Sequence, residues 1–203
     1  GEPDFWPMNE PLPPGVAYTT SLDGVDPTAW DMLLIASDRD LRASHPACFE
    51  RAVVYRPKTL VVGVGCDRGI PEEVVERGVE AVLSARGLSA RSVRALATID
   101  KKADEEAFVA LSRRRGWPLV TFPAEDLDAV PGIPSPSATV QRHVGTRGVA
   151  EPAALLAAGA ASLLVPKQVY TEPGVGRSLT VAVARVPMRA RRSATPPEAG
   201  AQT

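Results

Sequence analysis

Apolar residues in the middle of the chain form short continuous runs that alternate with helical stripes. The run Leu60–Val64 has no polar side chain, which is typical of a parallel strand covered by helices on both faces. The segment after it carries valine and leucine at helical spacing between Pro71, which suits a first helical turn, and Gly87, which ends the helix. This pattern predicts a buried strand followed by an amphipathic helix.

The pattern of strand and helix repeats further along the chain. A second strand is predicted over Val93–Thr98 and a third over Leu119–Phe122. The helix between them has Asp104 as its expected cap and Gly116 as its end, and the three arginines before Gly116 are expected to lie in solvent near the negative end of the helix dipole. Strands and helices that alternate at these spacings require right-handed crossovers, and therefore a parallel sheet.

Further elements are predicted on either side of this repeat. A helix is expected around Ala150–Ala158, and strands over Ser162–Val165 and Leu179–Val186 are expected to form a hairpin-like return with a mobile connection. Upstream, Met32–Ala36 is predicted to be a buried strand with few partners in its neighbourhood. The expected fold class is α/β: a three-layer sandwich with a largely parallel sheet and an extended amino-terminal arm.

The two ends of the chain differ from its centre. Five prolines fall in the first 14 positions, where no regular element could tolerate them. The last residues are basic, small or proline, and they lack the apolar side chains that would offset the entropy of ordering. We therefore expect an extended arm within residues 1–57, a compact domain over 58–187 and a disordered tail over 188–203.

Composition narrows the classes of function. The 23 basic and 24 acidic residues among 203 give a net charge of −1, which excludes the broad basic surface of a general nucleic-acid binder. No apolar run approaches the roughly 18 residues that span a membrane, and the first residues lack the pattern of a signal peptide. Two cysteines without a CxxC pair argue against a disulfide framework and a structural zinc site. We expect a cytoplasmic protein with no metal site and no nucleic-acid or membrane partner.

The loops that follow the predicted parallel strands are the expected place for a ligand. The first loop, Gly63–Gly69, lets backbone approach a ligand closely and leads to a helix amino terminus, which attracts anions. Its glycines are spaced GxGxxxG, which departs from the dinucleotide fingerprint, and it lacks the Gly-Lys-Ser/Thr of a Walker A loop. The alternative is that these glycines serve only the tight turn from strand to helix and bind no ligand.

Two further loops add polar groups to the same edge. The second loop, Thr98–Asp104, brings a hydroxyl, carboxylates and two ammonium groups, which suits the gripping of carboxylates. The third, Pro134–Ser137, is stiffened by its prolines and is expected to form a pocket wall. Lys167 is expected after a strand and before a flexible loop, where it either reaches a carboxylate or oxyanion or is merely solvated.

Two residues are candidates for catalysis from their positions alone. Glu151 near the start of a helix is either a proton acceptor or a partner of the helix dipole. Cys66 beside a helix amino terminus is expected to have a lowered thiol pKa, which makes nucleophilic chemistry conceivable. The only histidines, His45 and His143, lie in no recognisable nucleophile motif, so covalent catalysis is the less favoured reading.

Several separate segments carry a family resemblance. They are Tyr55–Lys58, Gly63–Gly69, Leu96–Glu105, Pro134–Pro136 and Gly148–Leu155. In this order they resemble the cobalamin-biosynthesis family CbiG and its relative CobE. The resemblance implies cobalt-precorrin-5A hydrolase activity, in which the δ-lactone of the corrinoid intermediate is opened and acetaldehyde is released.

The resemblance also implies a substrate and roles for the residues above. The implied substrate is a cobalt-precorrin or precorrin tetrapyrrole, which is a flat macrocycle with many carboxylates. Because the substrate carries its own cobalt, the protein is expected to need no cofactor. Other enzymes of the pathway are candidate partners. Glu151 or Asp100 is expected to assist attack of water on the lactone carbonyl, and Glu151→Gln is expected to abolish turnover without weakening binding. The expected substrate-binding residues are Gly63, Gly65, Cys66, Arg68, Gly69, Thr98, Lys101, Lys102, Ser135, Ser137 and Lys167.

The chain departs from the family pattern in ways that keep alternatives open. The family's amino-terminal domain is missing, and Trp30–Arg56 resembles only part of its central region. Ile70–Pro71 stands where the family has a hydroxyl residue at the start of the first helix, which removes one capping hydrogen bond. The alternative function is a non-catalytic, CobE-like module that binds or transfers a tetrapyrrole. A nucleotide-binding α/β domain is a third possibility, and it depends on the glycine loop alone.

Overall fold

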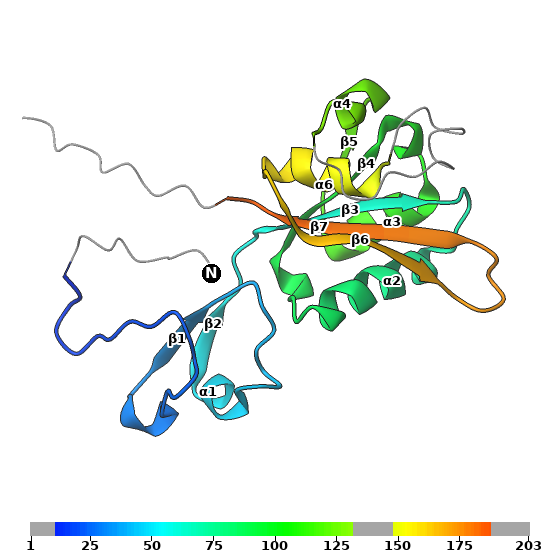
Figure 1. Ribbon diagram of the computed structural model, residues 1–203. Coiled ribbons are helices and arrows are strands. Elements are labelled where there is room, and N and C mark those ends of the chain that lie inside the picture. Colours follow the sequence, from blue (N-terminus) through cyan, green and yellow to red (C-terminus); the bar gives the residue numbers. More distant parts are fainter. Residues whose placement is uncertain (1–10, 132–147, 188–203) are drawn as a thin grey trace, which may run out of the picture. The chain divides into compact units, whose positions relative to one another are not determined.

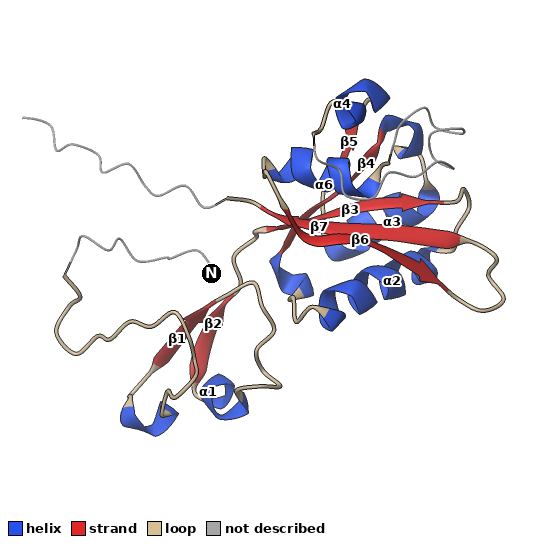
Figure 2. Cartoon of the chain, in the orientation of Figure 1, coloured by secondary structure: helices blue, strands red, loops and turns tan. Residues whose placement is uncertain are grey.

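The chain contains one large and one small β-sheet (Figures 1 and 2). The computed structural model describes residues 11–131 and 148–187. Both sheets belong to one compact unit, Leu22–Pro187. Three predicted features lie wholly or partly outside the described residues: the first ten residues of the extended arm expected within 1–57, the loop with Ser135 and Ser137, and the disordered tail expected over 188–203.

The large sheet has five strands in the order β5-β4-β3-β7-β6. Its parallel part consists of β3 (Leu60–Cys66), β4 (Val93–Ile99) and β5 (Leu119–Phe122), as the apolar runs predict. The hairpin of β6 (Leu163–Thr171) and β7 (Ser178–Arg185) is added through an antiparallel pairing of β7 with β3. Four strands therefore run in one direction and β7 runs in the other, which confirms a largely parallel sheet.

Helices cover both faces of this sheet. One face packs against α2 (Glu72–Ala85) and α3 (Glu106–Arg115), and the other packs against α6 (Ala150–Ala158) (Figure 1). Alternate residues of β3 point into the two cores: Val62 and Val64 lie with α2 and α3, whereas Val61 lies with α6. The short α4 (Ala124–Asp128) follows β5 and contributes the buried Leu127 to the core under α6. The three-layer α/β sandwich is thus confirmed.

The small sheet differs from the prediction for this part of the chain. β1 (Leu33–Ala36) pairs in parallel with β2 (Ala52–Tyr55), and α1 (Pro46–Glu50) connects them. The prediction that this strand has few partners nearby was wrong, and so was the prediction that it is buried, because Leu34 is 70% exposed. β2 is a run of four apolar residues without apolar-polar alternation in the sequence, and so short a run does not distinguish a strand from a helix. Upstream of β1, the only helical turn among residues 11–32 is η1 (Pro27–Ala29).

The end of β6 also differs from the prediction. The strand was expected to stop at Val165 but continues to Thr171, so that Lys167 lies within the strand and not after it. The pairing with β7 shifts register between Val165 and Gln168, where Pro166 stands. A bulge on an edge strand accommodates a proline, which has no N–H to donate to the neighbouring strand, and the strand resumes beyond it.

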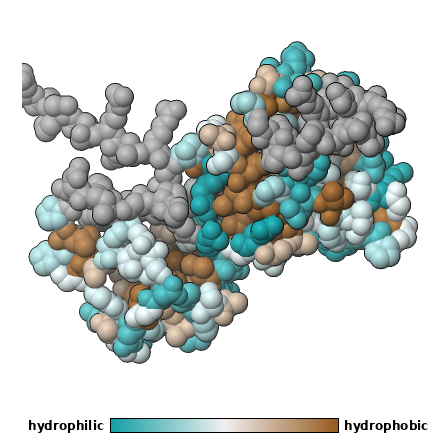
Figure 3. All heavy atoms as spheres, viewed as in Figure 1, coloured by the Kyte–Doolittle hydropathy of each residue, from teal (hydrophilic) through white to brown (hydrophobic). Residues whose placement is uncertain are grey.

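Apolar surface is visible in Figure 3 over the region where Figure 1 draws β6 and β7.

Charged side chains join elements that are distant in the sequence. Asp38, just after β1, is buried and forms a bidentate ion pair with Arg185 of β7, at 2.6 and 2.7 Å. The Thr59 hydroxyl donates to the same carboxylate at 2.7 Å. Near the carboxyl end of α3, Arg114 and Arg115 form ion pairs with three glutamates of α2. Two of the three arginines that were expected to lie in solvent thus hold α2 and α3 together.

In the described part of the chain, every helix is too short or too polar to cross a lipid bilayer.

Candidate functional site

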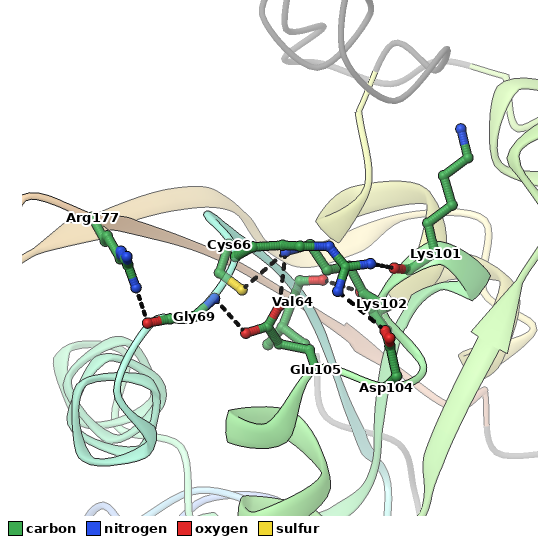
Figure 4. A network of polar contacts seen from close by, with 10 residues as sticks. Val64, Cys66, Gly69, Lys101, Lys102, Asp104, Glu105 and Arg177 are labelled. Atoms are coloured by element: carbon green, nitrogen blue, oxygen red, sulfur yellow. Dashed lines mark hydrogen bonds and ion pairs between the residues drawn. The ribbon is translucent and has the colours of Figure 1, made fainter.

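The loops after β3 and β4 meet at one edge of the large sheet (Figure 4). The Arg68 guanidinium donates to the Lys101 carbonyl at 2.6 Å and lies 3.3 Å from the Asp104 carboxylate. The Gly69 amide donates to Glu105 Oε1 at 2.8 Å. Carboxyl ends of parallel neighbours share an edge, which is why the topology brings these two loops into direct contact.

Glu105 is the centre of this cluster, although the sequence analysis did not identify it. Its carboxylate is 4% exposed and accepts from the Gly69 amide with one oxygen and from Lys102 Nζ, at 3.0 Å, with the other. Glu105 also occupies the position before α3, where Asp104 was the expected cap. That expectation was wrong: the side chain of Asp104 is 75% exposed and pairs with Arg68. The only signal in the sequence was a lysine three residues before a glutamate.

The arrangement changes the roles expected for Gly69 and Lys102. Both were expected to hold carboxylates of a ligand, but an internal carboxylate, that of Glu105, already occupies them. Gly69 has a φ of +68°, and the Arg177 guanidinium donates to its carbonyl, so both backbone groups of this glycine are engaged. The loop is therefore held in place by protein groups, and a ligand carboxylate would have to displace Glu105 to reach the Gly69 amide.

Cys66 lies at the end of β3, with its thiol beside Lys102. Burial raises the pKa of this thiol to about 12, even though the Lys102 ammonium, 3.9 Å from Sγ, acts in the opposite direction. The expected lowering of this pKa was wrong because desolvation by burial outweighs the favourable charge of Lys102. The thiol is protonated at neutral pH and is not an activated nucleophile.

Slow alkylation of Cys66 is a direct test of this environment. With a pKa of about 12, the thiolate fraction at pH 8 is about 10⁻⁴, against roughly a fifth for a free cysteine. Iodoacetamide is expected to label Cys66 of the folded chain about 10³-fold more slowly than Cys66 of the urea-unfolded chain, as followed by peptide mass spectrometry. Labelling of the folded chain at the rate of free cysteine would show that the thiol is not desolvated.

Three of the expected binding residues serve packing instead. Thr98 is fully buried and donates from its hydroxyl to the Val64 carbonyl at 2.8 Å, which joins β4 to β3. Gly63 lies directly under the first turn of α6, and Gly65 lies against Val149 and accepts from the Thr180 hydroxyl at 3.0 Å. Thr98 and Gly63 are buried and Gly65 is partly buried, and all three contact protein groups, so these residues fix the position of β3 beneath the loops.

The two catalytic candidates differ in access to solvent. Glu151 is 2% exposed, and its Oε1 accepts from the backbone amide of Lys167 at 3.0 Å. The structure thus brings Glu151 and Lys167 together at the β6 bulge, through the lysine's backbone. Asp100 is exposed and opens the short helix η3 (Asp100–Lys102). Among the two, Asp100 is the carboxylate that a large substrate can reach.

A hollow of about 620 Å³ lies beside this cluster, between the starts of α2 and α3. Its polar lining comprises one guanidinium and four carboxylates. They belong to Arg68, Glu72, Asp104, Glu105 and Glu106. Ion pairs with Arg68, Lys102 and Arg114 balance three of these four carboxylates. The cations at the hollow are thus already engaged by protein carboxylates, so the hollow does not suit a ring of further carboxylates. Figure 4 shows the Lys101 side chain pointing away from the cluster.

The β6–β7 hairpin adds polar groups to the same edge. Asp67 Oδ2 accepts from the backbone amide of Ser178 at 2.9 Å and from its hydroxyl at 3.0 Å. Hydrogen bonds from Arg77 and Tyr170 lower the pKa of Glu172 to about 2, so this carboxylate is ionised at neutral pH. Within the two described ranges, no three His, Cys, Asp or Glu side chains are grouped so that they could hold a metal ion.

Comparison with known proteins identifies the family. The family model described as "Cobalamin synthesis G C-terminus" matches residues 60–184, which is more than half of the chain. The chain belongs to the CbiG C-terminal family. The match begins at the first residue of β3 and ends within β7, so the family domain coincides with the five-stranded sheet and its helices. Membership assigns the chain a role in cobalamin biosynthesis.

Individual relatives agree with this membership. The chain is 34% identical over 188 residues to a cobalt-precorrin-5A hydrolase from Priestia megaterium, an alignment of 92% of this chain and 48% of that protein. The crystal structure of CobE, from the cobalamin biosynthetic pathway, matches with a TM-score of 0.57 and 32% identity over 66% of this chain and 94% of CobE. A cobalamin biosynthesis protein G homologue from Sulfolobus solfataricus shares the fold, with a TM-score of 0.51 and 18% identity over 91% of this chain and 50% of that one. The chain thus spans about half the length of the hydrolase that it matches.

Proposed function

We propose that the chain binds a cobalt-precorrin macrocycle and takes part in opening the lactone of cobalt-precorrin-5A, with release of acetaldehyde. The observation that carries this proposal is the alignment of 92% of the chain with the hydrolase from Priestia megaterium. CobE matches only 66% of the chain, although almost all of CobE is used in that match. The match to the hydrolase therefore extends over more of this chain than the match to CobE does, although it uses only 48% of the hydrolase.

Charge and access favour one part of the rim for the substrate. The hollow between α2 and α3 does not suit a ring of carboxylates, whereas the segment Asp100–Lys101 is exposed and carries an ammonium group that points away from the cluster (Figure 4). In the proposal, Lys101 attracts a side-chain carboxylate of the macrocycle. Arg68 holds this segment in place by donating to the Lys101 carbonyl. Arg177 and Lys102 act indirectly, by holding the Gly69 loop and Glu105.

Opening a lactone requires water to attack the ring carbonyl while a base accepts its proton. Asp100 is the proposed base, because its carboxylate is exposed on the rim beside Lys101. Glu151 is the second candidate, but it must first release the Lys167 amide and leave its buried position. The substrate brings its own cobalt, and the proposal requires no cofactor bound to the protein.

Trapping of acetaldehyde tests the proposal. The purified chain is incubated with the lactone intermediate, and aldehyde is captured as a hydrazone and quantified; wild type is expected to release it in proportion to enzyme. Asp100→Asn is expected to lower the rate by about 10²–10⁴-fold with little change in binding, since the amide cannot accept a proton. Asp126→Asn, an exposed carboxylate on α4, is the matched control and is expected to retain the wild-type rate.

Two other outcomes would change the assignment. Glutamine at position 151 still offers an oxygen to the Lys167 amide, so Glu151→Gln is expected to fold; loss of turnover in that variant alone would make Glu151 the base. Binding of the macrocycle with no aldehyde would reject hydrolysis by this chain and favour the CobE-like binding or transfer module.

A further inference from the structure

One face of the small sheet is apolar and open to solvent. Leu34 of β1 and Val53 of β2 are register partners and are 70% and 58% exposed. Tyr55, two residues along β2 from Val53 and therefore on the same face, is 59% exposed. A contiguous group of exposed apolar side chains on a protein surface often marks an interaction site.

The opposite face of this sheet is covered. Ile35 of β1 is only 6% exposed, and Val54, its register partner in β2, is less exposed than Val53 and Tyr55 on either side of it. Parallel strands occur almost only in sheets with both faces covered, and two strands alone are marginally stable. The β1–α1–β2 unit thus has the geometry of part of a larger layered domain, with one covering layer present.

The comparisons indicate what provides the other layer. The match to CobE covers 66% of this chain and uses 94% of CobE. This part is about as long as the family domain, which begins at residue 60, after β2. The hydrolase from Priestia megaterium, which matches 92% of this chain, has about as much polypeptide again outside the match. In that relative, the part that matches this chain is therefore joined to an additional half that CobE lacks.

We propose that the apolar face formed by Leu34, Val53 and Tyr55 is the docking surface for a polypeptide equivalent to the other half of the hydrolase from Priestia megaterium. This half covers β1 and β2 on the face that carries Leu34, Val53 and Tyr55. The inference goes beyond the proposed reaction, because it rests on the exposed face and the extent of the relatives and on no catalytic step.

Co-expression tests this surface. The untagged 203-residue chain is produced together with a tagged polypeptide comprising the part of the Priestia megaterium hydrolase that this chain does not match. The two are expected to co-purify at a one-to-one ratio, with slowed hydrogen exchange in β1 and β2 relative to the chain alone. Leu34→Lys/Val53→Lys is expected to lower the co-purified amount at least tenfold, because two ammonium groups would be buried in the interface.

A matched control separates the surface from a general effect of added charge. Ala81→Lys/Ser84→Lys places the same two charges on exposed positions of α2 and is expected to co-purify as wild type does. Both double variants replace exposed side chains, so circular dichroism and the thermal midpoint are expected to stay close to wild type. Absence of a complex, a complex insensitive to Leu34→Lys/Val53→Lys, or self-association of the chain through β1 and β2 would each overturn the proposal.

Discussion

Replacing Gly63 by alanine is expected to lower the free energy of unfolding by about 3 kcal/mol or more. A Cβ atom at this position of β3 would lie 1.9 Å from the Ala150 carbonyl oxygen and 2.9 Å from the Ala154 Cβ. The first of these atoms is backbone at the start of α6, so relief requires the whole helix to move away from the sheet. Urea unfolding followed by circular dichroism measures the loss.

Gly148→Ala is the control for this prediction. Apart from its chain neighbours, no atom of the described residues lies within 4 Å of a Cβ built on Gly148, and its backbone has no positive φ, so alanine is expected to change stability by no more than about 0.5 kcal/mol. A small effect of Gly63→Ala, comparable to that of the control, would show that α6 is not seated on β3 as closely as the structure has it. Partial recovery in Gly63→Ala/Ala154→Gly is not expected, because the Ala150 carbonyl remains.

Asp38→Asn is expected to cost about 3 kcal/mol, the second large effect. The Asp38 carboxylate is 6% exposed and the Arg185 side chain 15% exposed, and their two hydrogen bonds join the segment after β1 to β7. Asparagine keeps the shape but removes the charge, which leaves the guanidinium with no carboxylate in a largely desolvated position. Denaturant unfolding of the single variant gives the loss directly.

Two comparisons assign that loss to the buried pair. Asp104→Asn removes a carboxylate from the exposed pair with Arg68 and is expected to cost less than about 1 kcal/mol, because solvent screens that pair. Asp38→Asn/Arg185→Met is expected to be more stable than Asp38→Asn, since no unpaired charge remains. Equal losses in Asp38→Asn and Asp104→Asn would contradict a special role for burial.

Much of the large sheet could be predicted because its signals are local. Leu60–Val64 has no polar side chain, and a strand of that kind needs cover on both faces, which the following helices provide. Residues that start and end helices, such as Pro71 and Gly116, lie where the structure has helix boundaries. The short β2 was not predicted because four apolar residues without alternation carry too little signal, and its partner β1 was for that reason expected to have few partners nearby.

The candidate site was predicted less well, because chemistry there depends on contacts between loops. Cys66 and Lys102 are 36 residues apart, and only the fold shows that burial outweighs the nearby ammonium in setting the thiol pKa. Glu105 was overlooked for the same reason: its partner Gly69 is also 36 residues away. Glu151 is at the expected position in its helix, but whether its carboxylate faces solvent or a backbone amide is decided by the bulge in β6.

The sequence by itself determined the succession of strands and helices in the family domain, and through its motifs the family, because both depend on residues close together in the chain. Only the tertiary structure decided which polar groups are exposed to a ligand and which are occupied by protein partners. Burial and pairing are properties of surfaces that meet after folding. For that reason the Glu105 carboxylate occupies the Gly69 amide, Thr98 is withdrawn from the rim, and the face of Leu34 and Val53 remains open.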